Sequence, residues 1–473
     1  MTLLSAFASQ LAQHPERAAL ISPDGEALTY QELDSWAAAL AQRYARAGVQ
    51  ANTRVVVALG ISNELYAALI ALWRLGAVAV FPEPAAGLRG LRHALRVTAP
   101  EFFIGPRRIA LLCAVASGRL GLATPLPAAR ERADAKPPPS WPDDHPALIS
   151  FTSGSTGRPK GIVRSHGFLL AQQRALTPLL QPVDPTRDLV CLPMFVLAGL
   201  SLGVTSALPR GDIRRPPRQL AALLSRQIEQ QQLTRLLAPP SIVAALAETS
   251  AITKLRHIFT GGGPIWPTLM RRLLEVAPGA EIIAVYGSTE AEPIAHLAIR
   301  ELSSADWRRM EAGDGLPAGY PVPDIKLRLI DDEIQVSGEH VNRGYLDPTD
   351  DRSNKVREGA IVWHRTGDAG RLDERGSLWL LGRLEGRVGG RLPFQIEVAA
   401  RSWPGVENAA LLNADGHAYL VLSGDPNSES QWRQRIQQFE GLELAVVAAI
   451  PLDQRHHAKV DYGRLRTLLR SRR

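Results

Sequence analysis

The first eighty residues alternate between helical apolar spacing and unbroken apolar runs, and this alternation limits the chain to few folds. Thr29 and Glu32 have the spacing of a capping box in front of an apolar helical stripe. Residues 55–59 and 77–81 are continuous apolar runs that predict strands buried on both faces, with a helix over 65–75 between them. Helices that alternate with such strands predict a parallel sheet covered on both sides, and therefore an α/β fold.

The composition excludes several classes of protein. Apolar residues make up 45% and charged residues 21% of the 473-residue chain, which excludes a disordered or fibrous protein. Two cysteines, Cys113 and Cys191, cannot form a disulfide framework or a multi-cysteine zinc site. The start resembles an amphipathic helix more than a signal peptide, and the longest apolar region, 55–81, carries Glu64 and Arg74, so we expect no membrane span. These features predict a cytoplasmic protein.

The net charge of +7 raises the question of a nucleic-acid partner. Arginine supplies nearly all of the positive charge, because the chain has only six lysines. The arginines are scattered through every segment, without a basic tail or a long block of like charges. This distribution favours a solvated basic exterior, and we expect no nucleic-acid binding.

The pattern changes along the chain and predicts more than one domain. Alternation of helix and strand continues to about residue 290, which predicts parallel α/β subdomains. From about residue 320, short strands separated by Gly/Asp turns predict a small β-rich subdomain. The last ninety or so residues have the pattern of a compact α+β module.

The segment FTSGSTGRPKG, residues 151–161, is the most informative stretch, and it follows a predicted strand at 147–151. Its glycines let consecutive N–H groups face one way, its hydroxyls add donors and Lys160 adds a positive charge, so it predicts a polyphosphate cradle. It lacks the Walker spacing. The alternative is a flexible Ser/Gly loop, which Pro159 and Lys160 at its end disfavour. The candidate phosphate-binding residues are Thr152, Ser153, Gly154, Ser155, Thr156, Gly157 and Lys160.

Two further predicted strands end in similar segments. Residues 255–260 lead into Gly-Gly-Gly-Pro at 261–264, and residues 281–285 lead into Tyr-Gly-Ser-Thr-Glu at 286–290. Ligands bind beyond the carboxyl ends of parallel strands, so we expect these loops and the phosphate loop to face one crevice. There the glycines could lie against a flat base, the tyrosine could stack on it, and Glu290 is a ligand suited to Mg²⁺. The alternatives are a tight turn for the glycines and a helix N-cap for residues 288–290.

These motifs together resemble the acyl-adenylate-forming superfamily, which includes acyl-CoA synthetases, nonribosomal adenylation domains and luciferases. HRTGD at 364–368 and Gly382-Arg383 follow in the family's order, and the resemblance covers essentially the whole chain. It implies ATP and Mg²⁺ as cofactors and adenylation of a carboxylic acid with release of pyrophosphate. It also implies a large N-terminal domain, 1–382, and a small mobile C-terminal lid, 383–473.

The resemblance also implies a role for individual residues. Asp368 would bind both ribose hydroxyls with Arg383 close by, and Glu385 would be the hinge of the lid. Thr289 would contact the α-phosphate and Glu290 the magnesium ion. The remaining residues implied to hold the nucleotide, with the adenine between residues 262–264 and the tyrosine, are Gly262, Gly263, Pro264, Tyr286, Gly287 and Ser288.

Lys459 matches the single catalytic lysine that this family carries on its lid. A carboxylate and the α-phosphate are both anionic, so a cation between them lowers the cost of their approach most in the transition state. The alternative is a surface lysine in a C-terminal helix. His456 and His457 beside it do not predict a metal site, because no third ligand is evident nearby, and we expect them to support the lysine's loop.

The substrate class is indicated by residues 192–199, LPMFVLAG, which contain no acid. Amino-acid-activating members of the family place an aspartate there for the ammonium group, so an amino-acid substrate is disfavoured. Val196 stands where many acyl-CoA synthetases have a histidine, and the pocket looks suited to an acyl chain. The partner is therefore expected to be a small fatty or β-hydroxy carboxylic acid.

The short lid and the pattern DxRHxAK at 453–459 look most like the β-lactone synthetases of bacterial olefin biosynthesis. Those enzymes adenylate a β-hydroxy acid whose own hydroxyl then expels AMP. Two alternatives stay open: transfer of the acyl group to CoA or a carrier-protein thiol, and a non-catalytic nucleotide-binding protein that keeps the fold.

Overall fold

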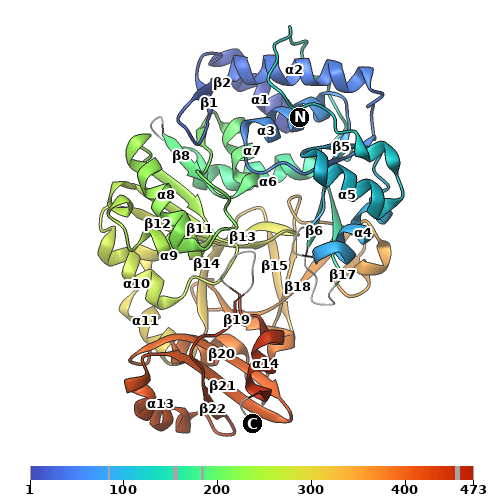
Figure 1. The fold of residues 1–473 in the computed structure, drawn as a ribbon. Helices are drawn as coiled ribbons and strands as arrows, with labels where there is room; N and C mark the ends of the chain where they lie inside the picture. Colours follow the sequence, from blue (N-terminus) through green and yellow to red (C-terminus); the bar gives the residue numbers. More distant parts are fainter. Residues whose placement is uncertain (1, 84–85, 153–157, 183–185, 453–458, 472–473) are drawn as a thin grey trace.

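A computed structural model describes residues 2–83, 86–152, 158–182, 186–452 and 459–471. Within these residues the strands form a 14-stranded, a five-stranded and a three-stranded sheet, which we call the large, N-terminal and C-terminal sheets. Helices pack around all three sheets (Figure 1). The predicted α/β class is therefore confirmed.

The N-terminal sheet has the strand order β5-β3-β4-β6-β7. Its first four strands are parallel, as predicted, and β7 is antiparallel to β6. The runs predicted at 55–59 and 77–81 fall on β3 and β4, and the helix predicted at 65–75 is α3, Asn63–Arg74. The strands are β3 Arg54–Val57, β4 Val78–Phe81, β5 Phe102–Ile104, β6 Pro146–Thr152 and β7 Lys160–Ser165.

The large sheet has the order β15-β16-β18-β19-β14-β13-β12-β11-β10-β8-β9-β1-β2, with β17 paired to β18. Its middle, from β12 to β1, is parallel, and β13 to β19 are antiparallel. The β-rich part expected from about residue 320 is present as β15 to β19, but the antiparallel pairing already begins at β13. Its first strands are β1 Ala18–Ile21, β2 Ala27–Thr29, β8 Arg187–Val190, β9 Thr205–Ala207, β10 Arg235–Ala238, β11 His257–Gly261 and β12 Glu281–Ser288. The others are β13 Ala291–Ala298, β14 Leu316–Pro321, β15 Lys326–Ile330, β16 Glu333–Ser337, β17 Lys355–Glu358, β18 Ile361–Leu372 and β19 Leu378–Arg383.

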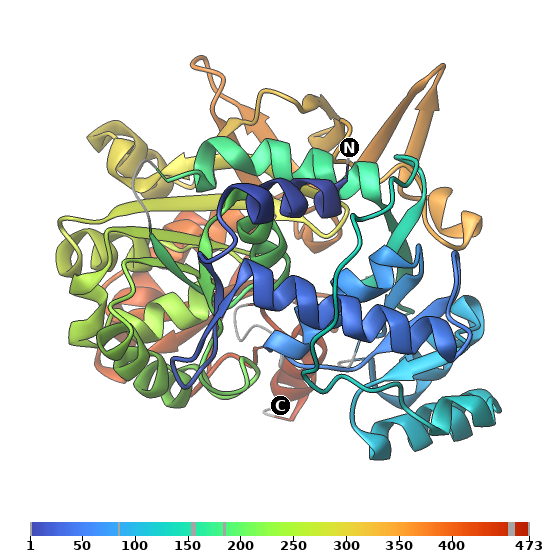
Figure 2. The ribbon, with the colours of Figure 1, turned by 90° about the horizontal axis from the view of Figure 1, so that it is seen from above.

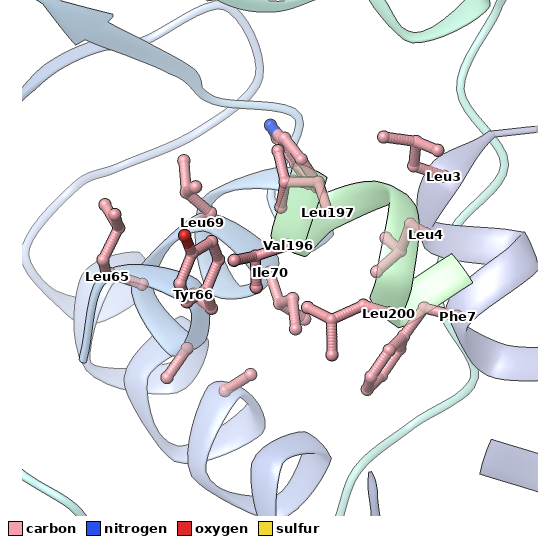
Figure 3. Packing of buried hydrophobic residues seen from close by; sticks show 14 of the residues in the cluster. Leu3, Leu4, Phe7, Leu65, Tyr66, Leu69, Ile70, Val196, Leu197 and Leu200 are labelled. Carbon is pink, nitrogen blue, oxygen red and sulfur yellow. The ribbon is translucent and has the colours of Figure 1, made fainter. Parts of the chain in front are cut away.

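A helical layer covers the junction of these two sheets. Figure 3 shows α7, which carries Val196 and Leu200, packed between α1 with Phe7 and α3 with Tyr66 and Ile70. Figure 2 shows α1 and α2 lying across the molecule from above. The helices are α1 Leu3–Gln13, α2 Tyr30–Arg46, α4 Gly87–Thr98, α5 Arg107–Ser117, α6 His166–Leu180, α7 Pro193–Leu202, α8 Pro217–Gln230, α9 Pro240–Leu246, α10 Pro267–Val276 and α11 Ser304–Glu311.

The C-terminal sheet has the order β20-β21-β22 and its own apolar clusters. Val398 of α12 nevertheless packs in one cluster with Trp379 of β19, and the Arg401 guanidinium lies 3.9 Å from the ring centroid of Trp266. The division at residues 382 and 383 and the mobility of the lid stay predictions. The elements are α12 Pro393–Ala400, β20 Val406–Ala414, β21 His417–Gly424, α13 Glu429–Arg435, β22 Glu443–Val446 and α14 Tyr462–Arg470.

Among the described residues, no helix is both long enough and apolar enough to cross a bilayer.

The capping box predicted at the start of α2 is present. The Thr29 hydroxyl accepts a hydrogen bond from the Glu32 amide at 3.1 Å, and the Glu32 carboxylate accepts one from the Thr29 amide at 3.2 Å. We expect Thr29→Ala to lower the free energy of unfolding by about 1 kcal/mol, the usual cost of a lost N-cap. Urea unfolding followed by circular dichroism measures this.

Thr124→Ala is the matched control, because Thr124 is an exposed threonine outside the helix N-caps. Equal unfolding midpoints for both variants would mean that the capping box does not stabilise α2.

Candidate active site

The three loops were predicted to face one crevice. In the structure, residues of all three line a single cleft of about 2470 Å³. Residues of the N-terminal sheet, the large sheet and the C-terminal segment all contribute to its walls. Of the site residues predicted from sequence, the cleft is lined by Thr152, Lys160, Gly262, Gly263, Pro264, Tyr286, Gly287, Ser288, Thr289, Glu290, Asp368, Arg383, Glu385 and Lys459. The other predicted residues, Ser153 to Gly157, lie outside the described residues.

The ends of the phosphate loop are fixed by strand pairing. Thr152 is the last residue of β6 and Lys160 the first of β7, and the two are direct partners in the antiparallel ladder. Lys160 is buried, and its Nζ lies 5.5 Å from the ring centroid of Tyr345. The ladder therefore holds the lysine beside the cleft, at the end of the loop.

The second and third loops begin on neighbouring parallel strands, because Gly261 at the end of β11 pairs with Val285 of β12. A Cβ atom on Gly261 would lie 2.6 Å from the Val285 carbonyl oxygen, and Gly262 has φ +85°. Both positions therefore require glycine, one for the close approach and the other for its left-handed backbone.

The strand β12 is longer than predicted and includes residues 286–288. Residues 289–290 then form the turn into the antiparallel strand β13. The helix N-cap considered as an alternative for residues 288–290 is therefore wrong. A hairpin allows Thr289 and Glu290 to project from the end of the sheet into the cleft.

Asp368 contacts two other predicted site residues, Tyr286 and Arg383. Its Oδ2 accepts a hydrogen bond from the Tyr286 hydroxyl at 2.8 Å, and its Oδ1 lies 3.3 Å from Arg383 Nε. Arg383 also donates through Nη1 to the Thr366 carbonyl oxygen at 2.7 Å. Burial, and then the negative charge of Asp368, raise the pKa of Tyr286 well above its usual value. The pair Asp368 and Arg383 sits on directly opposed positions of β18 and β19.

Glu290 is held by a residue that the sequence did not single out. The Tyr345 hydroxyl donates to Glu290 Oε1 at 3.0 Å. The Tyr345 ring has two ammonium groups near it, Lys160 at 5.5 Å and Lys355 at 5.2 Å from its centroid. Each distance is within the range of a cation–π interaction. No sequence signal identified Tyr345 or Lys355, because the contacts join segments far apart in the chain.

Lys355 is buried at the start of β17 and donates to the Asn342 carbonyl oxygen. Burial lowers its pKa to about 8, although the negative charges of Glu290 and Asp351 act in the opposite direction. Lys355 is therefore a cation near Glu290 whose charge is sensitive to mildly alkaline pH.

A buried arginine of the N-terminal sheet contacts the backbone of the turn at residues 289–290. Arg164 of β7 donates to the Thr289 carbonyl oxygen at 2.9 Å and is almost completely buried. Glu292 lies close enough to favour its charged form, and Gln172 donates to the Glu292 carboxylate at 3.3 Å. Arg164 and Glu292 also line the cleft, and neither was predicted as a site residue.

One part of the cleft is apolar. Leu65 and Leu69 of α3 and Phe195 and Leu197 of α7 line it. The side chains of Leu69 and Leu197 lie close to each other between the two helices (Figure 3). This surface can accommodate a hydrocarbon chain beside the polar loops.

The C-terminal segment contributes Lys459 to the cleft as an exposed side chain. Glu397 and Tyr462 lie on the same wall, and the Tyr462 hydroxyl donates to Glu397 Oε1 at 3.3 Å. Burial raises the pKa of Glu397 to about 7. The histidines predicted to support the lysine's loop, His456 and His457, lie outside the described residues.

Residues 7–346 match the family model described as AMP-binding enzyme. The chain is 30% identical to an olefin β-lactone synthetase of Stenotrophomonas maltophilia, over 93% of this chain and 90% of that protein. It is 31% identical to a feruloyl-CoA synthase of an Amycolatopsis species, over 85% of each. Its fold is similar to ATP-bound MatB from Rhodopseudomonas palustris, with a TM-score of 0.82, 21% identity and 99% coverage of both chains.

The lowered pKa of Lys355 can be measured directly, because the chain has only six lysines. We expect one lysine Cε resonance of ¹³C-lysine-labelled protein to titrate with a midpoint near pH 8, since burial destabilises the ammonium form. That resonance should be absent from Lys355→Met. A resonance assigned to Lys355 in this way that does not shift between pH 7 and 9 would contradict the prediction.

Proposed function

Because this chain belongs to the AMP-binding enzyme family, we propose that it adenylates an aliphatic or β-hydroxy carboxylic acid with ATP and releases pyrophosphate. The observation that carries this proposal is the lining of one cleft. Cationic and anionic groups, including Lys160, Glu290, Asp368 and Lys459, share that cleft with an apolar branch. An ATP-dependent reaction of an apolar acid needs both kinds of surface next to each other.

The nucleotide would lie between the three loops. Asp368, whose carboxylate is fixed by Tyr286 and Arg383, would accept hydrogen bonds from the ribose hydroxyls. Residues 262–264 and the Tyr286 ring would hold the adenine. The residues that would hold the phosphates are Thr152 to Gly157, Lys160, Gly287, Ser288 and Thr289.

One unsatisfied group supports this arrangement. The Ser288 hydroxyl is buried on the cleft wall without a hydrogen-bond partner among the described residues. A buried hydroxyl without a partner is costly, so its position favours a ligand that supplies one.

Glu290 would hold Mg²⁺ that accompanies the nucleotide. Tyr345 donates to one of its carboxylate oxygens, which leaves the other available as a hard oxygen ligand. The described residues contain no group of three or more His, Cys, Asp or Glu side chains that could hold a metal ion by themselves. The nucleotide's phosphates would therefore supply other ligands. When bound, the ion would neutralise phosphate charge.

Lys459 would act at the reacting atoms. An oxygen of the substrate carboxylate attacks the α-phosphorus, the bond from that phosphorus to the bridging oxygen breaks, and pyrophosphate leaves. Both reactants are anionic, so an ammonium group between them stabilises the transition state.

The acid's hydrocarbon chain would enter the apolar branch between α3 and α7. Of residues 192–199, residues 192–195 and 197 line the cleft, and none of them is an acid that could pair with an ammonium group, so an amino-acid substrate is disfavoured. In this branch, burial of each methylene would favour binding by about 0.8 kcal/mol.

For the second step we favour lactonisation. The β-hydroxyl of the acyl adenylate attacks its own carbonyl carbon, the bond to AMP breaks, and the hydroxyl proton is lost as AMP leaves. Likeness to an olefin β-lactone synthetase and the short lid support this choice. A second candidate, transfer to the thiol of CoA or of a carrier protein, is favoured by likeness to a feruloyl-CoA synthase.

The proposal includes the predicted division into a domain over 1–382 and a lid over 383–473 that rotates at Glu385. It also includes a cytoplasmic site of action, because the reaction consumes ATP.

We expect Lys459→Ala to slow carboxylate-dependent pyrophosphate release by ~10²–10³-fold, comparable to loss of an oxyanion-hole donor. ATP binding, measured by calorimetry, should stay within a few-fold of the wild type. Lys254→Ala is the matched control, because Lys254 is an exposed lysine away from the cleft. Pyrophosphate release at the wild-type rate in Lys459→Ala would contradict the role given to this lysine.

The second step is tested by its products. With ATP and a mixture of fatty and β-hydroxy acids, we expect mass spectrometry to detect a β-lactone, or the alkene from its decarboxylation, without any thiol. A thioester that forms only when CoA is added would instead support the second candidate.

A further inference from the structure

The helices α4 and α5 lie side by side at the outer edge of the N-terminal sheet (Figures 1 and 2). The inner face of α5 is buried through Ala110, Cys113 and Ala114, which pack in one cluster with Phe103 and Leu95. This packing fixes which side of α5 faces outward.

The outward side is apolar. The described part of the chain has eight large hydrophobic side chains that are exposed, and five of them belong to these two helices and the turn that follows. Val115 is 70% exposed and Leu120 is 78% exposed, so they are almost fully in water. We call these five residues the α4–α5 patch: Leu88, Leu111, Leu112, Val115 and Leu120. Leu111, Leu112 and Val115 lie on one face of α5, because Val115 follows the two leucines at helical spacings of four and three residues. Exposed apolar side chains grouped in this way mark an interaction site.

The segment that carries the patch has an excess of positive charge. Residues 86–125 contain six arginines and a single carboxylate, Glu101. All six arginines are exposed, and none forms an ion pair with a carboxylate of the described residues. They are Arg89, Arg92, Arg96, Arg107, Arg108 and Arg119. Asp347 and Asp350 lie near His93 of α4, but both form ion pairs with Arg158. The six arginines are therefore available to an external anionic partner.

Exposed leucines flanked by arginines match the chemistry of a lipid leaflet with negative headgroups. The apolar side chains can enter the acyl boundary while the arginines stay at the phosphates, each basic residue adding about 1 kcal/mol near an anionic surface. We propose that the α4–α5 patch binds the surface of an anionic lipid bilayer.

The cleft reaches the same surface. Leu88 and Leu112 belong to the patch and also line the cleft, together with Leu91, Ile109 and Cys113 between them. An acid dissolved in the bilayer would thus meet an apolar route towards the branch described above. This consequence rests on the proposed function, whereas binding of the bilayer does not.

Cosedimentation with vesicles tests the proposal. The probes are phosphatidylcholine vesicles with and without one quarter phosphatidylglycerol, at low salt. We expect the wild type to bind the anionic vesicles at least tenfold more tightly than the neutral ones, because the arginines face anionic headgroups. Added salt should weaken this preference.

Three variants sharpen the test. Leu111→Gln/Val115→Gln/Leu120→Gln removes apolar side chains that do not line the cleft, and should weaken binding to anionic vesicles by about tenfold or more. Arg107→Gln/Arg108→Gln/Arg119→Gln should abolish the preference for anionic vesicles. The matched control, Ile330→Gln/Leu372→Gln, removes exposed apolar side chains elsewhere and should bind as the wild type does.

Pyrophosphate release with a short, water-soluble acid is measured for all variants, so that loss of folding or of the proposed reaction is separated from loss of lipid binding. Equal binding of the wild type to both kinds of vesicle would overturn the proposal. The proposal would also be overturned if Leu111→Gln/Val115→Gln/Leu120→Gln bound the anionic vesicles as tightly as the wild type does. A wild type that binds neither vesicle but sediments as a dimer would overturn it in favour of a contact between copies of this chain.

Discussion

The charge balance around Glu290 is the interaction on which the rest of the cleft depends. A carboxylate and two ammonium groups lie around one tyrosine ring, and both of the lysines that carry these ammonium groups are buried. A buried ammonium without an anion nearby would cost several kcal/mol, so Lys355 is tolerable because Glu290 and Asp351 favour its charge. The same balance holds Glu290 at the turn between β12 and β13, facing the loops that bring the other site residues.

A second layer of support explains why this turn is well defined. Arg164 contacts the backbone of Thr289, and its own burial is offset by Glu292. Glu292 in turn accepts from Gln172 of α6. The turn at residues 289–290 is therefore held by a contact from the N-terminal sheet as well as by the strands β12 and β13 that it joins. This contact links the two sheets at the cleft.

Local sequence patterns predicted much of this structure. The capping box at Thr29, the parallel order of β3 and β4 and the short strands after residue 320 are all indicated by patterns of neighbouring residues, and the structure has each of them. The family motifs singled out Asp368, Arg383, Lys459 and Glu290 as site residues, and in the structure all four line one cleft. The extension of β12 through Ser288 was missed, because glycine and serine are read as turn residues. Tyr345, Lys355 and Arg164 were missed because their contacts join distant segments, and the outward leucines of α5 depart from the usual amphipathic pattern.

The direct pairing of Thr152 with Lys160 has a consequence for how this chain can diverge. Both ends of the phosphate loop are rungs of one antiparallel ladder, and neighbouring residues on a strand point to opposite faces. Losing or gaining a single residue at the start of β7 would turn Lys160 away from Tyr345 and shift its neighbours to the wrong face.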